Sequence, residues 1–276
     1  QGARDGEGEF LGLLRGYPEL TEVSTGDNEF GDDFWLLYHM HPGVISTRKA
    51  PAQGMGPSLS DELNAVPVVS IVTDVTSIFD RDAAGIYANS SKTDGQSGYA
   101  DPRGMEWQRA SSFEFIEPGM AGYVQTNTGL LITGGSSLLQ SVTRKHNLRV
   151  RFTGSYGEKE LTYPIFGSGG VTNFKSLHLK NPTHDSWSNT VGTTGRLLHN
   201  GVTSTYSVGD VATYCNDGWA RSAHEAMGHV TPSQRWVHLF LNGIYWGPHQ
   251  ISERVDNDFM NSHFGSGSYD VLKQGS

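Results

Sequence analysis

The sequence predicts a protein of the α+β class that is predominantly β, with a twisted antiparallel sheet and a few flanking helices. Three observations lead to this fold class. Charged residues make up only 18% of the chain and 35 of its 276 residues are glycine, which is typical of β-rich chains with many turns. Short β-branched runs are bounded by glycine and proline. One pair of such runs is joined by an Asn-Gly dipeptide.

The strongest local signal is a β-hairpin within residues 235–251. The runs 236–241 and 244–246 are apolar and aromatic, and Asn242-Gly243 separates them. Asparagine and glycine tolerate the positive φ angles of a type I′ turn, which joins antiparallel strands tightly. Further strands are predicted at residues 34–38, 68–72, 112–116, 129–132 and 146–152.

The segment 146–152 alternates between apolar and polar residues, as a half-buried strand does. The two sides carry Leu148, Val150 and Phe152 against Asn147, Arg149 and Arg151. By the same parity, Lys145 falls on the polar side. The sequence therefore predicts a strand with a basic outer face.

Two helices are predicted to flank the hairpin. Asp217 is expected to cap a helix that runs to Met227 and stops at Gly228. Asp256 is expected to cap a second helix, which ends at Gly265.

The remaining segments carry weaker signals. Residues 192–210, rich in Gly, Thr and Ser, are expected to form an exposed loop. Cys215 is expected to be a small buried residue. Residues 1–57 are interpreted as an irregular N-terminal arm, and residues 58–276 as the main domain.

The composition limits the classes of partner that this protein is expected to bind. The formal charge is −9 and no basic stripe is present, which argues against nucleic acid. The sequence contains no apolar run of about 20 residues, so it predicts no membrane-spanning helix. The single cysteine excludes an intrachain disulfide and a multi-cysteine zinc site. An anionic ligand would need local positive charge or a metal ion.

The region after the hairpin resembles a motif of the CotH-kinase-like proteins, atypical protein kinases of the spore-coat CotH type. Residues 241–247 (LNGIYWG) and 252–256 (SERVD) are similar to the family's LNG-x-YWG hairpin and its E-R-x-D segment. Upstream blocks follow in the family's order, among them 67–74 (PVVSIVTD) and 144–152, and resemble large secreted bacterial members. The resemblance implies that residues 58–276 form the N-terminal lobe region of such a kinase.

The resemblance also implies an activity. Proteins of this family transfer the γ-phosphoryl group of ATP, with Mg²⁺, to serine or threonine of a secreted or coat protein. Such transfer depends on positioning and on charge neutralisation by a lysine and Mg²⁺. ATP and Mg²⁺ are therefore the implied cofactors. A protein substrate or structural partner outside the cytoplasm is the implied partner.

The implied nucleotide site includes Arg144-Lys145, before the basic strand, and Glu253, after the hairpin. Lys145 would reach the phosphates from a cleft shared with Glu253; the alternative is a solvated basic edge. Gly134 and Gly135 would let backbone N–H groups approach a phosphate, or would form an ordinary turn.

Asp256 is a candidate metal ligand by the same resemblance, although its position also suits a helix N-cap. Leu131, Leu138 and Asn216 stand where the family often carries arginine, so charge-assisted hydrogen bonds to phosphate would be lost.

The catalytic and metal-binding aspartates of the family lie downstream of the matched segment. We therefore expect no catalytic residue in this chain. Two alternative functions follow. One is a non-catalytic secreted structural or interaction module with the same fold. The other is a carbohydrate-binding or adhesion domain that uses exposed tryptophans.

Overall fold

The computed structural model describes residues 61, 63–79, 85–87, 105–138, 145–185 and 212–271. Outside these ranges it describes the backbone of short strands: β1 (Ala3–Arg4), β2 (Phe10–Leu11), β3 (Glu22–Asp27), β4 (Asp33–Leu37), β12 (Thr194–His199) and β13 (Val202–Ser207). The strand expected at 34–38 is β4. Arg144 lies outside the described residues, as does most of the expected arm 1–57.

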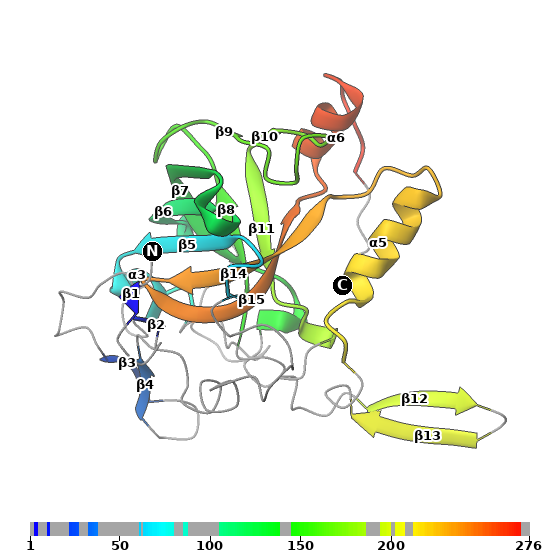
Figure 1. The fold of residues 1–276 in the computed structure, drawn as a ribbon, viewed down its shortest axis with the longest axis horizontal. Coiled ribbons are helices and arrows are strands. Elements are labelled where there is room, and N and C mark those ends of the chain that lie inside the picture. Colours follow the sequence, from blue (N-terminus) through cyan, green and yellow to red (C-terminus); the bar gives the residue numbers. More distant parts are fainter. Residues whose placement is uncertain are drawn as a thin grey trace.

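Seven strands form a closed barrel (Figure 1). They are β5 (Val68–Thr73), β6 (Arg109–Ile116), β7 (Tyr123–Thr133), β8 (Asn147–Arg151), β11 (Ser176–Lys180), β14 (Gln234–Leu241) and β15 (Ile244–Glu253). Around the barrel the order is β11-β15-β14-β5-β6-β7-β8, and β8 pairs again with β11. The strands expected within the main domain are therefore confirmed.

The closure of the barrel depends on one parallel pair. Strand β5 pairs in parallel with β14, with Val68 opposite His238, whereas the other barrel pairings are antiparallel. The chain is predominantly β with a few helices, as predicted, but its main sheet is mixed and closed instead of purely antiparallel. Because the parallel partners are far apart in the sequence, no local pattern indicates their pairing.

The barrel interior is the hydrophobic core. Val69 and Ile71 of β5 are fully buried. Val72, the next residue after Ile71, points to the other side of the strand and is 41% exposed. On β8, Leu148 and Val150 are buried and the intervening arginines are partly exposed, which confirms the predicted alternation. Inward apolar and outward polar side chains follow from the two-residue period of a strand.

The predicted hairpin turn is confirmed. Asn242 and Gly243 have φ angles of 50° and 82°, as a type I′ turn requires. The Asn242 side chain accepts a hydrogen bond from the backbone N–H of Thr73 at 2.8 Å. The turn is thereby fastened to β5 across the parallel junction.

Among the residues that the structure describes, a few helices with defined bounds accompany the barrel. They are α3 (Val75–Phe79), α5 (Asn216–Ala226) and α6 (Asn257–Phe264), with short 3₁₀ turns η2 (Met105–Trp107), η3 (Pro118–Met120), η4 (Ser136–Leu138) and η5 (Thr183–Asp185). Strands β9 (Leu161–Thr162) and β10 (Asn173–Phe174) form a small separate ribbon. Within the described part of the chain, no helix combines the length and apolarity needed to cross a membrane.

Both predicted helices exist, but one begins elsewhere. Helix α6 starts after Asp256, as predicted. Helix α5 has Cys215 at its N-cap, so Asp217 lies in its first turn and pairs with Arg221 at 2.9 Å. Cys215 is exposed, contrary to the expectation that it is buried. It lies at a helix start outside the barrel, where no core surrounds it.

The prediction of an exposed loop at 192–210 is wrong. Strands β12 and β13 pair antiparallel there, from Thr194 opposite Ser207 to His199 opposite Val202. The sequence between them is Asn200-Gly201, the same dipeptide that identifies the other hairpin. The high content of small polar residues obscured this signal.

Candidate functional site

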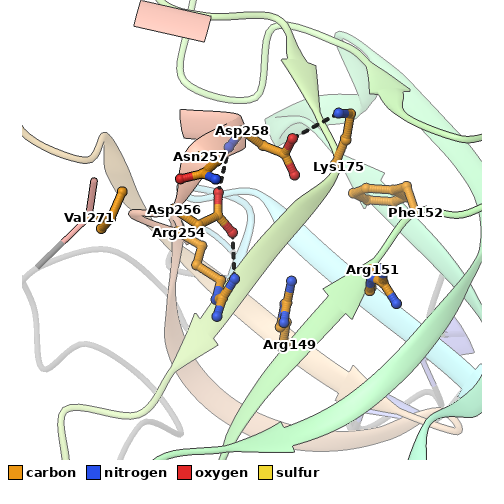
Figure 2. Close-up of a pocket in the computed structure, with 9 residues that line it drawn as sticks. All are labelled: Arg149, Arg151, Phe152, Lys175, Arg254, Asp256, Asn257, Asp258 and Val271. Atoms are coloured by element: carbon orange, nitrogen blue, oxygen red, sulfur yellow. Dashed lines mark hydrogen bonds and ion pairs between the residues drawn. The ribbon is translucent and has the colours of Figure 1, made fainter. Parts of the chain in front are cut away.

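A pocket of about 500 Å³ lies on the outside of the barrel, beneath the start of α6 (Figure 2). Its volume is in the range of small-molecule sites, roughly 300–1,000 Å³. It is lined by Arg149, Arg151, Phe152, Lys175, Arg254, Asp256, Asn257, Asp258 and Val271.

Four separate parts of the chain supply this lining. Alternation along β8 places Arg149 and Arg151 on the outer face, about 7 Å apart at their Cα atoms. Lys175 precedes β11, which pairs with β8. Arg254 follows β15, and Asp258 lies in the first turn of α6. The register of β8, β11 and β15 therefore gathers basic residues that are distant in the sequence.

Two ion pairs lie in the pocket wall. Arg254 Nη1 lies 2.5 Å from Asp256 Oδ2, and Lys175 Nζ lies 2.8 Å from Asp258 Oδ1 (Figure 2). The lining contains four basic and two acidic side chains, so it has an excess of two positive charges. Such an excess in a concave site favours an anionic ligand.

The excess charge belongs to Arg149 and Arg151. Among the described residues, neither lies within ion-pair distance of a carboxylate. Arg149 donates one hydrogen bond, from Nη2 to Ser176 Oγ at 3.3 Å, and its buried Nε has no partner in the described structure. Burial and then the nearby Arg254 lower the pKa of Arg149 to about 10. An anion bound beside Arg149 would offset the repulsion between the positive charges of Arg149 and Arg254.

The two carboxylates of the pocket differ in the hydrogen bonds and ion pairs that they already make. Asp256 Oδ1 accepts hydrogen bonds from the backbone N–H groups of Asp258 at 3.1 Å and Phe259 at 3.2 Å, which confirms it as the N-cap of α6. Its Oδ2 pairs with Arg254. Among the described residues, the Asp258 side chain pairs only with Lys175, and these two side chains are 42% and 56% exposed. Asp258 could therefore exchange its present ion-pair partner for a ligand more readily than Asp256 could.

Glu253 lies outside the pocket lining. Its Oε2 accepts a hydrogen bond from the backbone N–H of Ser233 at 2.8 Å, and its Oε1 lies 2.9 Å from His263 Nε2. The residue is 5% exposed. Glu253 therefore joins the end of β15 to α6 and to the segment before β14.

Lys145 lies near the other end of β15. Its ammonium group occupies the space that a Cβ atom at residue 247 would fill, and Gly247 has a φ of +92°. Burial lowers the pKa of Lys145. Gly247 and Glu253 are about 20 Å apart along an extended strand, so the structure does not bring Lys145 and Glu253 together.

Gly134 and Gly135 lie in the connection between β7 and η4, outside the pocket lining. The position of a Cβ at Gly134 is 3.7 Å from Asn147 Nδ2, at the same end of β8 as Lys145. Of the positions where the family often carries arginine, Leu131 and Leu138 are buried, at 3% and 7% exposure. These two leucines therefore pack inside the protein.

Trp246, Tyr245 and Trp219 differ in how far they are exposed. Trp246 donates a hydrogen bond to Tyr87 at 2.8 Å, and Tyr245 lies 2.9 Å from His238, so both are part of the packed barrel. Trp219 on α5 is 74% exposed, and Met227 just beyond α5 is 72% exposed. No group of three or more His, Cys, Asp or Glu side chains that could hold a metal occurs in the described residues.

Sequence reasoning identified part of this pocket. The alternation along β8 predicted its basic outer face, and the segment with Arg254 and Asp256 belongs to the motif at residues 252–256. Lys175 and Asp258 gave no signal, because their pairing depends on how α6 packs against β10 and the residue that follows it. In comparisons with known proteins, no protein-family model matches the chain, and no curated protein matches it.

Proposed function

We propose that the pocket binds the phosphate groups of a nucleotide, with ATP as the ligand. We further propose that the chain is the nucleotide-binding region of a CotH-kinase-like protein. The excess of two positive charges in the pocket, contributed by Arg149 and Arg151, supports this function. Guanidinium groups suit phosphate because their planar N–H donors can form paired, charge-assisted hydrogen bonds.

Mg²⁺ would reduce the negative charge of the triphosphate and is commonly held by one or two carboxylates together with phosphate oxygens. Asp258 fits this role better than Asp256, both of whose oxygens are already engaged. Completion by a downstream lobe would allow phosphorylation of secreted or coat proteins. Without one, the chain would be a non-catalytic module that binds nucleotide.

Calorimetric titration tests the proposal. ATP with Mg²⁺ should bind saturably, and the double substitution Arg149→Gln, Arg151→Gln should remove most of the binding. Arg221→Gln is the matched control, since Arg221 is paired with Asp217 on α5 and does not line the pocket. Unchanged binding by the double variant would refute the proposed site.

Lys145→Ala distinguishes this pocket from the site implied by the sequence resemblance. The pocket excludes Lys145 from its lining, so its loss should leave the affinity for ATP unchanged. Loss of ATP binding in this variant, with the arginine variant unaffected, would instead locate the phosphates at Lys145.

The exposed Trp219 favours one alternative, a carbohydrate-binding or adhesion surface on α5. Binding on a glycan array that is lost in Trp219→Ala but retained in the arginine double variant would support this function.

A further inference from the structure

We propose that α5 is a contact surface between two copies of this chain, which pair antiparallel with Ala223 on the two-fold axis. The surface is the outer face of α5, made of residues 219, 220, 223, 226 and 227, which share one side of the helix. No residue of α5 is buried, and Trp219 and Met227 are 74% and 72% exposed. A contiguous exposed apolar patch is typical of an interaction site.

The opposite side of α5 meets the rest of the protein through polar groups. The Asp217 carboxylate lies 3.6 Å from the Lys180 ammonium at the end of β11. A Cβ atom at Gly218 would lie 3.0 Å from the side-chain nitrogen of Gln234 on β14. The apolar side of a surface helix normally faces the core, so the orientation of α5 is reversed. Its outer face points away from the barrel, which α5 flanks (Figure 1), and stays in water unless another molecule covers it.

The outer face is complementary to itself. Ala220 and Ala226 lie three positions to either side of Ala223, and Trp219 and Met227 lie four positions to either side. In an antiparallel pair with Ala223 on the two-fold axis, Trp219 is therefore level with Met227 of the second copy. A two-fold interface requires this symmetry, because the same patch is used on both copies. The three alanines would let the two helix axes approach closely.

Charge and space also favour a second copy as the occupant. The outer face carries no charged side chain, so no like charges meet across the axis. Because each α5 turns this face away from its own barrel, the two barrels would lie on opposite sides of the helix pair. The pair would bury roughly 1,000 Å² in total, at the lower limit of specific interfaces, with the two Trp219 side chains as the largest contributors. The dimer should therefore be weak and depend on protein concentration.

Sedimentation velocity over a range of protein concentrations tests the inference. The unaltered chain should approach twice the mass of one chain at about 100 μM and above. Ala223→Glu and Ala223→Lys each place two like charges at the axis, so each variant alone should remain a monomer. An equimolar mixture of the two should regain the dimer, because opposite charges then meet at the axis. Trp219→Ala should weaken dimerisation at least about tenfold.

Glu225→Gln is the matched control on α5, because Glu225 lies outside the outer face, and it should leave the association unchanged. The double variant Arg149→Gln, Arg151→Gln should also dimerise normally, which separates this inference from the phosphate site. A monomer at every concentration would overturn the inference, as would a mixture of the two Ala223 variants that stays monomeric. Glycan binding by a monomer that is lost in Trp219→Ala would overturn it and assign the face to carbohydrate. Thermal unfolding checks that the Ala223 variants are folded, and Trp219→Ala tests the interface at a side chain that is exposed in the monomer.

Discussion

At the scale of single residues, burial decides which basic side chains are available to a ligand. Lys145 is packed against Gly247, and His249 is fully buried beside it, with its Nδ1 3.2 Å from the carbonyl oxygen of Gly247. His146 is also fully buried, and its Nδ1 lies 2.7 Å from the Ser137 carbonyl oxygen. Arg149, by contrast, borders the pocket. Burial lowers the pKa of Lys145, His146 and His249, which favours their neutral forms.

The two buried histidines predict sensitivity to acid. Burial lowers the pKa of His146 to about 4 and that of His249 to about 3, from an ordinary value of 6.5. Below pH 6.5 the unfolded chain binds protons that the folded protein does not, so stability is complete above pH 6.5 and falls on acidification. Each histidine should remove about 2 kcal/mol between pH 6.5 and pH 5.

Denaturant unfolding at a series of pH values measures this loss. His146→Asn retains a donor for the Ser137 carbonyl but does not titrate. It should therefore show a shallower decrease in stability than the unaltered protein, whatever its stability at pH 7. An identical slope would contradict the assignment of His146 as neutral in the folded protein.

A side chain at Gly247 should destabilise the protein. Alanine there would meet the Lys145 ammonium and would have to adopt a φ of +92°. Gly247→Ala should lower the unfolding free energy by about 1–3 kcal/mol. Gly169→Ala is the control, because a Cβ at Gly169 meets no atom within 4 Å. Similar melting temperatures for the two variants would argue against the positive φ of Gly247.

At the scale of elements, polar contacts connect α6 to the end of barrel strand β15 and to the residue before β11. His263 contacts Glu253 at the end of β15, Asp258 contacts Lys175 before β11, and Asp256 caps the helix. Phe259 adds one buried apolar side chain. The helix thus depends more on these polar anchors than on apolar burial, and the shape of the pocket depends on the helix.

Removal of the cap should therefore loosen α6. Asp256→Ala should cost about 1 kcal/mol through the lost cap and should also leave Arg254 without its ion pair. Hydrogen exchange of the amides of Asp258 and Phe259 should become faster. Asp258→Asn should leave their exchange nearly unchanged. Equal protection in Asp256→Ala and the unaltered protein would contradict the cap as the main anchor.

At the scale of the whole molecule, the barrel core connects strands from the first and last parts of the described chain. The parallel pair β5–β14 closes the ring, and the Asn242 side chain holds Thr73 at its edge. Because the barrel interior is shared by all seven strands, a defect in one strand should weaken the entire cooperative unit.

Adjacent residues on β5 test this directly. Ile71 is fully buried in the barrel, whereas Val72 is 41% exposed. Ile71→Ala should cost about 2–5 kcal/mol through lost burial and the remaining cavity. Val72→Ala should cost about 0.5 kcal/mol. Thermal or denaturant unfolding gives both values, and comparable losses would contradict the inward direction of Ile71.

The sequence by itself determined the local elements. The Asn242-Gly243 turn, the alternation of β8 and the cap at Asp256 depend on residues close together in the chain, whose conformational preferences act wherever the segment lies. The basic outer face carrying Arg149 and Arg151 was visible for the same reason. The second hairpin at 194–207 is also encoded locally, by Asn200-Gly201, although its small polar residues are typical of a loop.

Only the tertiary structure decided how these elements combine. The parallel pairing of β5 with β14 joins segments that no periodicity links, and it turns a set of strands into a closed barrel. The same register separates Lys145 from Glu253 and brings Arg149 to Lys175 and Arg254. Strand pairing depends on contacts between residues that are distant in the sequence, and burial depends on what those contacts cover. Local sequence patterns therefore predict neither the strand pairing nor the burial.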